Sequence, residues 1–139
     1  MSASYQPLDG WRLQGSYNLL KEDIRVKPGR ADFNNALNET SDPEQQYSLR
    51  SSLNLTQHVE FDTGLRWVDR RRVNSGGVPA AVPSYYELDV RLGWRVRADL
   101  ELSVVGRNLL HGRHPEYGVP GPNRIEIGRS IFGKVTWRY

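Results

Sequence analysis

The stretch from Tyr85 to Leu109 constrains the fold most, because apolar and charged residues alternate along it with a period of two. One set is apolar and comprises Tyr86, Leu88, Val90, Leu92, Trp94 and Val96. The other set is mostly charged and comprises Tyr85, Glu87, Asp89, Arg91, Gly93 and Arg95. After a polar break at residues 97–99, Leu100, Leu102 and Val104 alternate with Glu101, Ser103, Val105 and Arg107. A period of two predicts a β-hairpin. An apolar face opposite a fully charged one is typical of strands between lipid and a wet lumen.

Length and hydropathy are compatible with such a fold. The 139 residues suffice for one domain. The mean hydropathy is only -0.65, but a transmembrane barrel hides its apolar face in alternation, so this value does not exclude one. No run approaches the roughly 18 apolar residues of a membrane helix. Residues 1–7 lack the basic and apolar regions of a signal peptide, so we expect an exported protein to be longer than this chain.

Charge and cysteine content exclude several classes of function. The net charge is +3, from 19 basic and 16 acidic residues, and the arginines are scattered, which does not favour a nucleic-acid partner. The absence of cysteine excludes disulfides, thiol catalysis and the common structural zinc sites.

The alternation recurs along most of the chain and predicts an all-β, antiparallel up-and-down meander of about seven long strands. A first strand ends at the turn 7–10, and further strands are expected at 11–19, 46–55, 59–67, 85–96, 100–107 and 126–139. The segments 21–44, 69–84 and 110–125 are long polar loops, whereas the turns at 56–58 and 97–99 are short. Short turns at one end and long loops at the other are typical of a transmembrane β-barrel, with the short turns on the periplasmic side.

This arrangement predicts which residues meet which solvent. Toward lipid we expect Leu88, Val90, Leu92, Leu102 and Val104. Toward the lumen we expect Glu87, Asp89, Arg91, Glu101 and Arg107. Trp11, Tyr47, Trp94, Trp137 and Tyr139 are expected near the short-turn ends, as a periplasmic aromatic girdle. Arg129 falls on the apolar face near the outer interface, and Phe132 on the polar face, where we expect it to pack against lumen side chains.

The charged side chains predict ion pairing rather than chemistry. The carboxylates of Glu60, Asp62, Glu87, Asp89 and Glu101 share their faces with Arg50, Arg66, Arg91 and Arg107. A hydrated ion-pair network is therefore favoured over paired-carboxylate catalysis. Since no nucleophile has a base and an orienting group, we expect no enzyme and no cofactor.

One group has the residue types of a metal site. His111, His114 and Glu116 lie close together in the sequence, but Gly112 and Pro115 place them in a loop. We expect His114 and Glu116 to anchor this loop rather than to bind a metal.

A second group is basic. Arg70, Arg71 and Arg72, with Lys27 and Arg30, lie in the predicted outer loops. Their guanidinium groups could bind anionic ligands, because a guanidinium pairs with carboxylate or phosphate oxygens through two parallel hydrogen bonds. Solubility of the loops explains them equally well.

Four segments resemble the C-terminal region of TonB-dependent outer-membrane receptors: residues 47–55, residues 86–95, residues 106–110 with 114–116, and residues 126–139. The resemblance implies the closing strands of a 22-stranded barrel in the bacterial outer membrane, which imports siderophores, cobalamin or similar large solutes. Its partners would be the rest of the barrel, the plug, TonB, outer-membrane lipid, lipopolysaccharide and the barrel-insertion machinery. Residues 1–139 contain no counterpart of the plug or the TonB box. The resemblance also implies that the terminal aromatic strand, with Val135, Trp137 and Tyr139, is the assembly signal. The residues alone leave an alternative open, a self-contained small β-barrel that binds a ligand or is structural.

Overall fold

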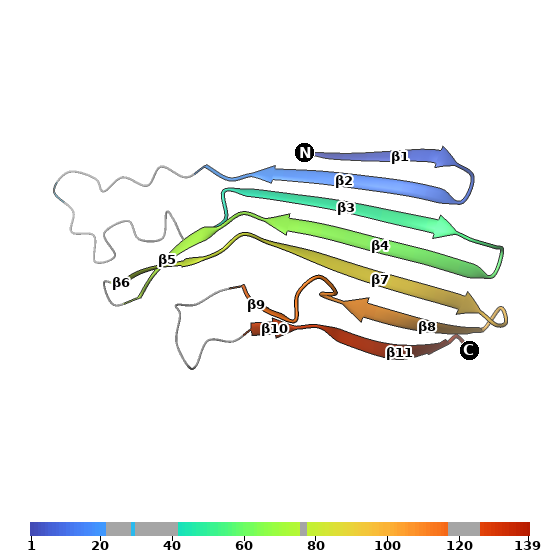
Figure 1. Cartoon of the computed structure of the whole chain (residues 1–139). Coiled ribbons are helices and arrows are strands. Elements are labelled where there is room, and N and C mark those ends of the chain that lie inside the picture. Colours follow the sequence, from blue (N-terminus) through green and yellow to red (C-terminus); the bar gives the residue numbers. More distant parts are fainter. Residues whose placement is uncertain (22–28, 30–41, 76–77, 117–125) are drawn as a thin grey trace.

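The computed structural model describes residues 1–21, 29, 42–75, 78–116 and 126–139, and it places seven strands in one antiparallel sheet (Figure 1). In spatial order these are β1 (Ser2–Leu8), β2 (Trp11–Leu19), β3 (Gln45–Asn54), β4 (Val59–Val68), β7 (Tyr85–Arg95), β8 (Leu100–Arg107) and β11 (Ser130–Trp137). Each strand pairs with the next one in this order, so the predicted all-β meander of seven strands is confirmed. Among the described residues, no helix is long and apolar enough to cross a membrane.

Two small hairpins lie outside the seven-stranded sheet; three of their four strands fall in segments predicted to be loops, and the fourth falls in the predicted last strand. β5 (Arg71–Ser75) pairs with β6 (Val78–Val82), and β9 (Arg113–Pro115) pairs with β10 (Glu126–Gly128). The prediction of long loops at 69–84 and 110–125 was therefore wrong in part, because these segments contain the short strands β5, β6 and β9. The prediction of one continuous strand over 126–139 was also wrong.

The break in the last strand has a local cause on its neighbour. β8 ends at Arg107, and Asn108 follows with a positive φ of 52°, a conformation that ends an extended strand. β10 consequently has no β8 residue opposite it and pairs with β9 instead. At the break, the Arg129 amide donates to the Gly112 carbonyl at 3.2 Å.

The short turns all lie at one end of the sheet, as predicted. Gly10 has a φ of +79°, which suits the two-residue turn between β1 and β2. In the next turn, Thr56 Oγ1 accepts hydrogen bonds from the amides of His58 and Val59 at 3.1 and 3.0 Å. The long connections leave from the opposite end of the sheet (Figure 1).

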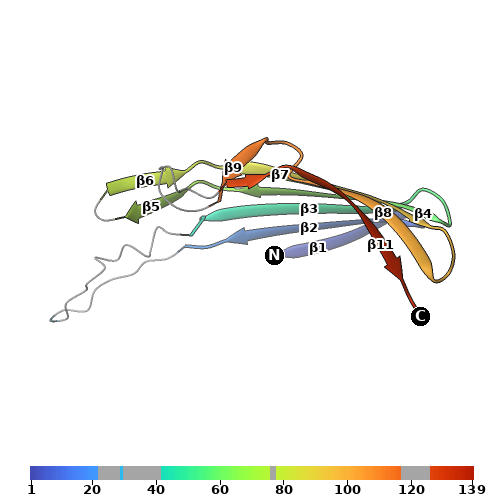
Figure 2. The same cartoon turned by 90° about the horizontal axis from the view of Figure 1, so that it is seen from below.

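The sheet is a single twisted and curved layer (Figure 2). Its register aligns residues of one kind across strands; for example, Leu53, Phe61, Leu92 and Val104 lie on successive strands at the same level. Val68 and Val82 are the buried hydrophobic residues of the described part. A layer without a packed core of its own must be stabilised by what contacts its two faces.

Candidate functional site

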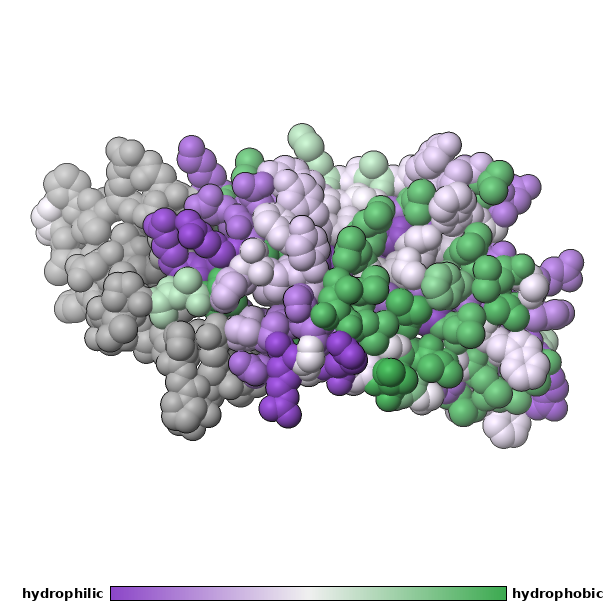
Figure 3. Space-filling model, viewed as in Figure 1, coloured by the Kyte–Doolittle hydropathy of each residue, from purple (hydrophilic) through white to green (hydrophobic). Residues whose placement is uncertain are grey.

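One face of the sheet is apolar and open. The register places all five residues predicted to face lipid on this face, together with Leu49, Leu65, Val135 and Trp137. Exposure reaches 56% for Val104 and 68% for Val135. Figure 3 shows hydrophobic side chains gathered over the part of the sheet near the short turns. A contiguous apolar surface of this kind marks a site of interaction with lipid or protein.

Aromatic residues border the apolar face at the long-loop end. Tyr17, Tyr47, Trp67 and Tyr86 form a row across β2, β3, β4 and β7, with successive ring centroids 4.7, 5.1 and 6.4 Å apart. The prediction that Tyr47 lies near a short turn was wrong, because β3 begins at Gln45, directly after a long connection. The register, which pairs Tyr47 with Tyr17 and Trp67, places it at the opposite end.

Tryptophans border the apolar face at the short-turn end. Trp11, Trp94 and Trp137 lie there, as predicted. Trp94 is eight residues from Tyr86 on β7, and at a rise of about 3.3 Å per residue they are roughly 26 Å apart. With the strand tilt of about 35–45° in outer-membrane barrels, this length spans roughly 20 Å along the membrane normal, which is of the same order as their apolar band of about 25 Å.

The C-terminus is tied to the turn between β7 and β8. Trp137 Nε1 donates to Asp99 Oδ2 at 3.1 Å, and the Arg138 amide donates to the Asp99 carbonyl at 2.9 Å. Tyr139 lies beyond the end of β11 and is fully exposed. Val135 and Trp137 thus belong to the apolar face, whereas Tyr139 is held by no strand pairing.

The other face carries the predicted ion-pair network, centred on Arg91. Its Nη1 lies 2.6 Å from Asp62 Oδ2 and 3.3 Å from Glu60 Oε2, and its Nη2 contacts Glu101. Gly93 makes room for the guanidinium, since a Cβ there would lie 2.6 Å from Arg91 Nη2. Because three carboxylates from β4 and β8 share one cation on β7, this group ties three strands together.

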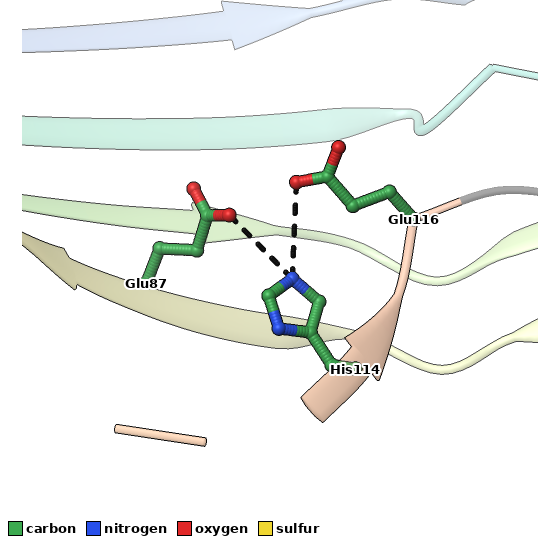
Figure 4. Close-up of side chains that lie close together, drawn as sticks. All are labelled: Glu87, His114 and Glu116. Carbon is green, nitrogen blue, oxygen red and sulfur yellow. Dashed lines mark ion pairs between the residues drawn. The ribbon is translucent and has the colours of Figure 1, made fainter. Parts of the chain in front are cut away.

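A second group lies near the long-loop end of the same face. Arg66 Nη2 is 2.7 Å from Glu87 Oε2 and 2.9 Å from Glu116 Oε1. His114 Nε2 lies 3.5 Å from Glu87 Oε1 and 3.8 Å from Glu116 Oε1 (Figure 4). The group joins β4 and β7 to the β8–β11 connection, which confirms that His114 and Glu116 anchor this loop.

His114 is the most enclosed member of this group, with 6% of its surface exposed. Its ring packs on Tyr85 at a centroid distance of 4.3 Å. Burial is the largest cause that lowers the pKa of His114 below its ordinary value; Glu116 acts in the opposite direction, and His111 and Arg66 lower it further. The imidazole is therefore biased toward its neutral form.

The remaining predicted lumen residues lie on this face with other partners. Asp89 Oδ1 accepts a hydrogen bond from the Asn108 amide at 3.0 Å. Arg107 stacks over the Phe132 ring at 5.5 Å, which confirms the predicted packing of Phe132 against lumen side chains. Arg50 and Arg107 enter no ion pair formed among the described residues.

The basic triplet divides into different roles. Arg71 Nη2 donates to the Glu116 carbonyl and so supports the same loop anchor. Arg70 and Arg72 are exposed. Arg30 lies outside the described residues. Anion contacts by these arginines stay a prediction.

Sequence reasoning missed the contact between Arg66 and Glu116, which are 50 residues apart. It also missed that Glu87 faces His114. The available signal for this polar cluster was the presence of His114 close to Glu116 in the same loop. No local pattern indicated which strand of the sheet these side chains would contact.

An open antiparallel meander with one apolar and one charged face, girdled by aromatic residues, has the architecture of a segment of a transmembrane β-barrel.

No protein-family model matches the chain. Solved structures show which barrels it is similar to. The ferric-catecholate import receptor Fiu from Escherichia coli matches 99% of the chain with 20% identity and a TM-score of 0.73. The siderophore receptor PiuA from Acinetobacter baumannii matches 98% with 18% identity and a TM-score of 0.71. A mutant of the ferric enterobactin receptor PfeA from Pseudomonas aeruginosa matches 98% with 12% identity and a TM-score of 0.75.

The chain has the fold of part of the barrel of such siderophore receptors. It spans about a fifth of their length, namely 20%, 20% and 21% of the three chains.

Proposed function

We propose that this chain is the C-terminal part of the barrel of a TonB-dependent receptor in the bacterial outer membrane, and that the receptor takes up a siderophore or a similar large solute. The match of 98–99% of the chain to three siderophore receptors carries this proposal. These proteins are receptors, which agrees with the expectation that the chain is not an enzyme. The rest of the barrel, the plug, TonB, outer-membrane lipid and lipopolysaccharide would be its partners.

The two edges of the sheet support the proposal of a larger barrel over a self-contained small one. Within the part of the chain that the structure describes, β1 pairs only with β2, and β11 pairs only with β8. Unpaired strand edges cannot face the hydrocarbon of a membrane, because their amides and carbonyls would have no partner. Further strands on both sides would satisfy them.

Uptake by iron-starved cells tests this function. The cells lack their own catecholate receptors and carry the complete reading frame to which this chain belongs. They should accumulate a labelled ferric siderophore when TonB is present and lose this accumulation when TonB is deleted. Cells with an empty vector are the control. Failure to accumulate any of a panel of ferric siderophores and cobalamin, or accumulation without TonB, would contradict the proposal.

The proposal assigns the apolar face to lipid and the polar face to the lumen. Spin labels at position 90, on the apolar face, and position 91, on the polar face, test this assignment in lipid bilayers. The label at Val90 should report apolar surroundings and the label at Arg91 aqueous ones. The reverse result would describe a soluble barrel with its apolar face inside.

A further inference from the structure

Glu87, His114 and Glu116 form a cluster that the proposed function does not use. Each offers one ligand atom, and these atoms all lie within 4.8 Å of one another. Glu87 comes from β7, His114 from β9, and Glu116 from the residues directly after β9. Figure 4 shows both carboxylates directed at the same nitrogen, Nε2 of His114.

The imidazole of His114 is buried without a hydrogen-bond partner. Its side chain is only 7% exposed, and neither Nδ1 nor Nε2 forms a hydrogen bond within the described residues. A buried polar nitrogen without a partner costs free energy. The contact with Tyr85 holds the ring, so that Nε2 points between the two carboxylates, where a cation would satisfy it.

Arg66 already contacts both carboxylates, but it leaves the oxygens needed for a cation available. It contacts Glu87 through Oε2, whereas Oε1 is the oxygen nearest to His114. Glu116 Oε1 contacts both Arg66 and His114, and a carboxylate oxygen has a second lone pair to offer. Arg66 therefore fixes the orientation of both carboxylates, as outer partners of metal ligands do.

We propose that Glu87, His114 and Glu116 bind a divalent transition-metal ion such as Zn²⁺. The distances of 3.5 and 3.8 Å from Nε2 to the two carboxylates are close to the separation of about 3.4 Å between two ligands of a tetrahedral zinc ion. An imidazole with carboxylates suits zinc and its neighbours better than Ca²⁺ or Mg²⁺, which prefer oxygen ligands alone.

This site departs from the sequence expectation of a loop anchor without metal, and Glu87 replaces His111 in the trio considered there. A bound ion would join β7 to the connection between β8 and β11. It would therefore fasten this loop to the polar face of the sheet.

Metal titration of the complete receptor that contains this chain, folded in lipid or detergent and freed of metal with a chelator, tests the site. The wild-type chain should bind one Zn²⁺ and show no comparable binding of Mg²⁺. His114→Phe keeps a ring against Tyr85 but removes the ligand, and should weaken Zn²⁺ binding by about tenfold or more, since even outer-shell changes cost about 10–100-fold. His58→Phe is the matched control, because His58 is exposed in the β3–β4 turn at the other end of the sheet, and it should bind like wild type.

Glu116→Gln is a second variant that tests the metal site if circular dichroism shows that His114→Phe does not fold. It preserves the size of a partly exposed side chain and should also weaken binding. The proposal is overturned if the wild-type chain shows no saturable Zn²⁺ binding, or if either a folded His114→Phe chain or Glu116→Gln binds like wild type.

Discussion

The two faces of the seven-stranded sheet differ in what holds their side chains. On the apolar face, large side chains such as Val104, Val135 and Trp137 are mostly exposed. On the polar face, Glu101 and Ser103 are largely covered, and arginines from neighbouring strands pair with carboxylates. The charged face therefore supplies its own partners, whereas on the apolar face the described residues contact one another mainly along its aromatic borders and leave the surface between them uncovered. In a soluble protein the apolar side chains are covered and the charged ones are exposed, so this distribution is reversed. It suits a sheet between lipid and an aqueous lumen.

The largest expected effect comes from placing a charge in the middle of the apolar face. Val90 lies halfway between Tyr86 and Trp94, so Val90→Arg should lower the free energy of unfolding from lipid by about 2–4 kcal/mol, the cost of an arginine at the bilayer midplane. Equilibrium unfolding in urea from lipid vesicles measures it. Ser52→Arg, at an exposed position of the polar face, is the control and should cost less than about 0.5 kcal/mol. Equal effects of the two variants would remove the difference between the faces.

The second effect tests whether the polar face depends on its internal partners. Arg91→Met removes the cation that pairs with Asp62 and leaves Glu101 with only the more distant Arg138, at 3.8 Å. Because these groups are only partly buried, we expect a loss of about 2–3 kcal/mol, below the roughly 3–5 kcal/mol of a fully buried pair.

The matched control for Arg91 is an exposed ion pair of the same kind. Arg97 contacts Asp99 at 3.3 Å in the β7–β8 turn, with most of its side chain in solvent. Arg97→Met should change the free energy of unfolding by less than about 0.5 kcal/mol. If Arg91→Met were as mild as this control in urea unfolding, the network would be no more than a solvated charged surface.

A smaller effect should separate the loop anchor from the rest of the polar face. With a chelator present to exclude metal, Glu116→Gln weakens the contact with Arg66 and should cost about 0.5–1 kcal/mol, because this pair is partly exposed. Hydrogen exchange should accelerate in β9 and β10 but not in β7 or β8. Glu126→Gln, an exposed carboxylate of β10, is the control, and uniform acceleration over the whole sheet would contradict a local anchor.

The smallest effect on stability is expected at the C-terminus. Tyr139 lies beyond the last strand and is fully exposed, so its deletion from the full-length receptor should cost less than about 0.5 kcal/mol in refolding experiments. If Val135, Trp137 and Tyr139 are the assembly signal, the same deletion should reduce the amount inserted into the outer membrane. An extended segment can be recognised by adding to an exposed sheet edge, with alternate side chains in pockets. Unchanged insertion would leave only a role in the girdle.

The alternation was sufficient to predict the seven strands and the residues on each face of the sheet. Together with the loop lengths, it also predicted that the short turns lie at one end of the sheet. Leu88 and Val90 share a face with Leu65 and Thr63 because each strand alternates with a period of two and burial of one kind of residue on each face selects the register, even across the long connection between β4 and β7. The Arg91 network was predictable for the same reason, since Asp62 and Glu101 come from the two strands beside it. Tyr47 was misplaced because it was assigned to the wrong end of a correctly predicted strand.

The sequence by itself determined the single layer, its two unlike faces and its alternating connections, because these properties follow from neighbouring residues and from turn lengths. Only the tertiary structure decided that the β8–β11 connection returns over the polar face and brings His114 and Glu116 to Glu87 and Arg66. It also decided that β10 pairs with β9, whereas β11 pairs with β8. Contacts of a long loop depend on where the whole sheet places the distant partner, and no local pattern encodes that position.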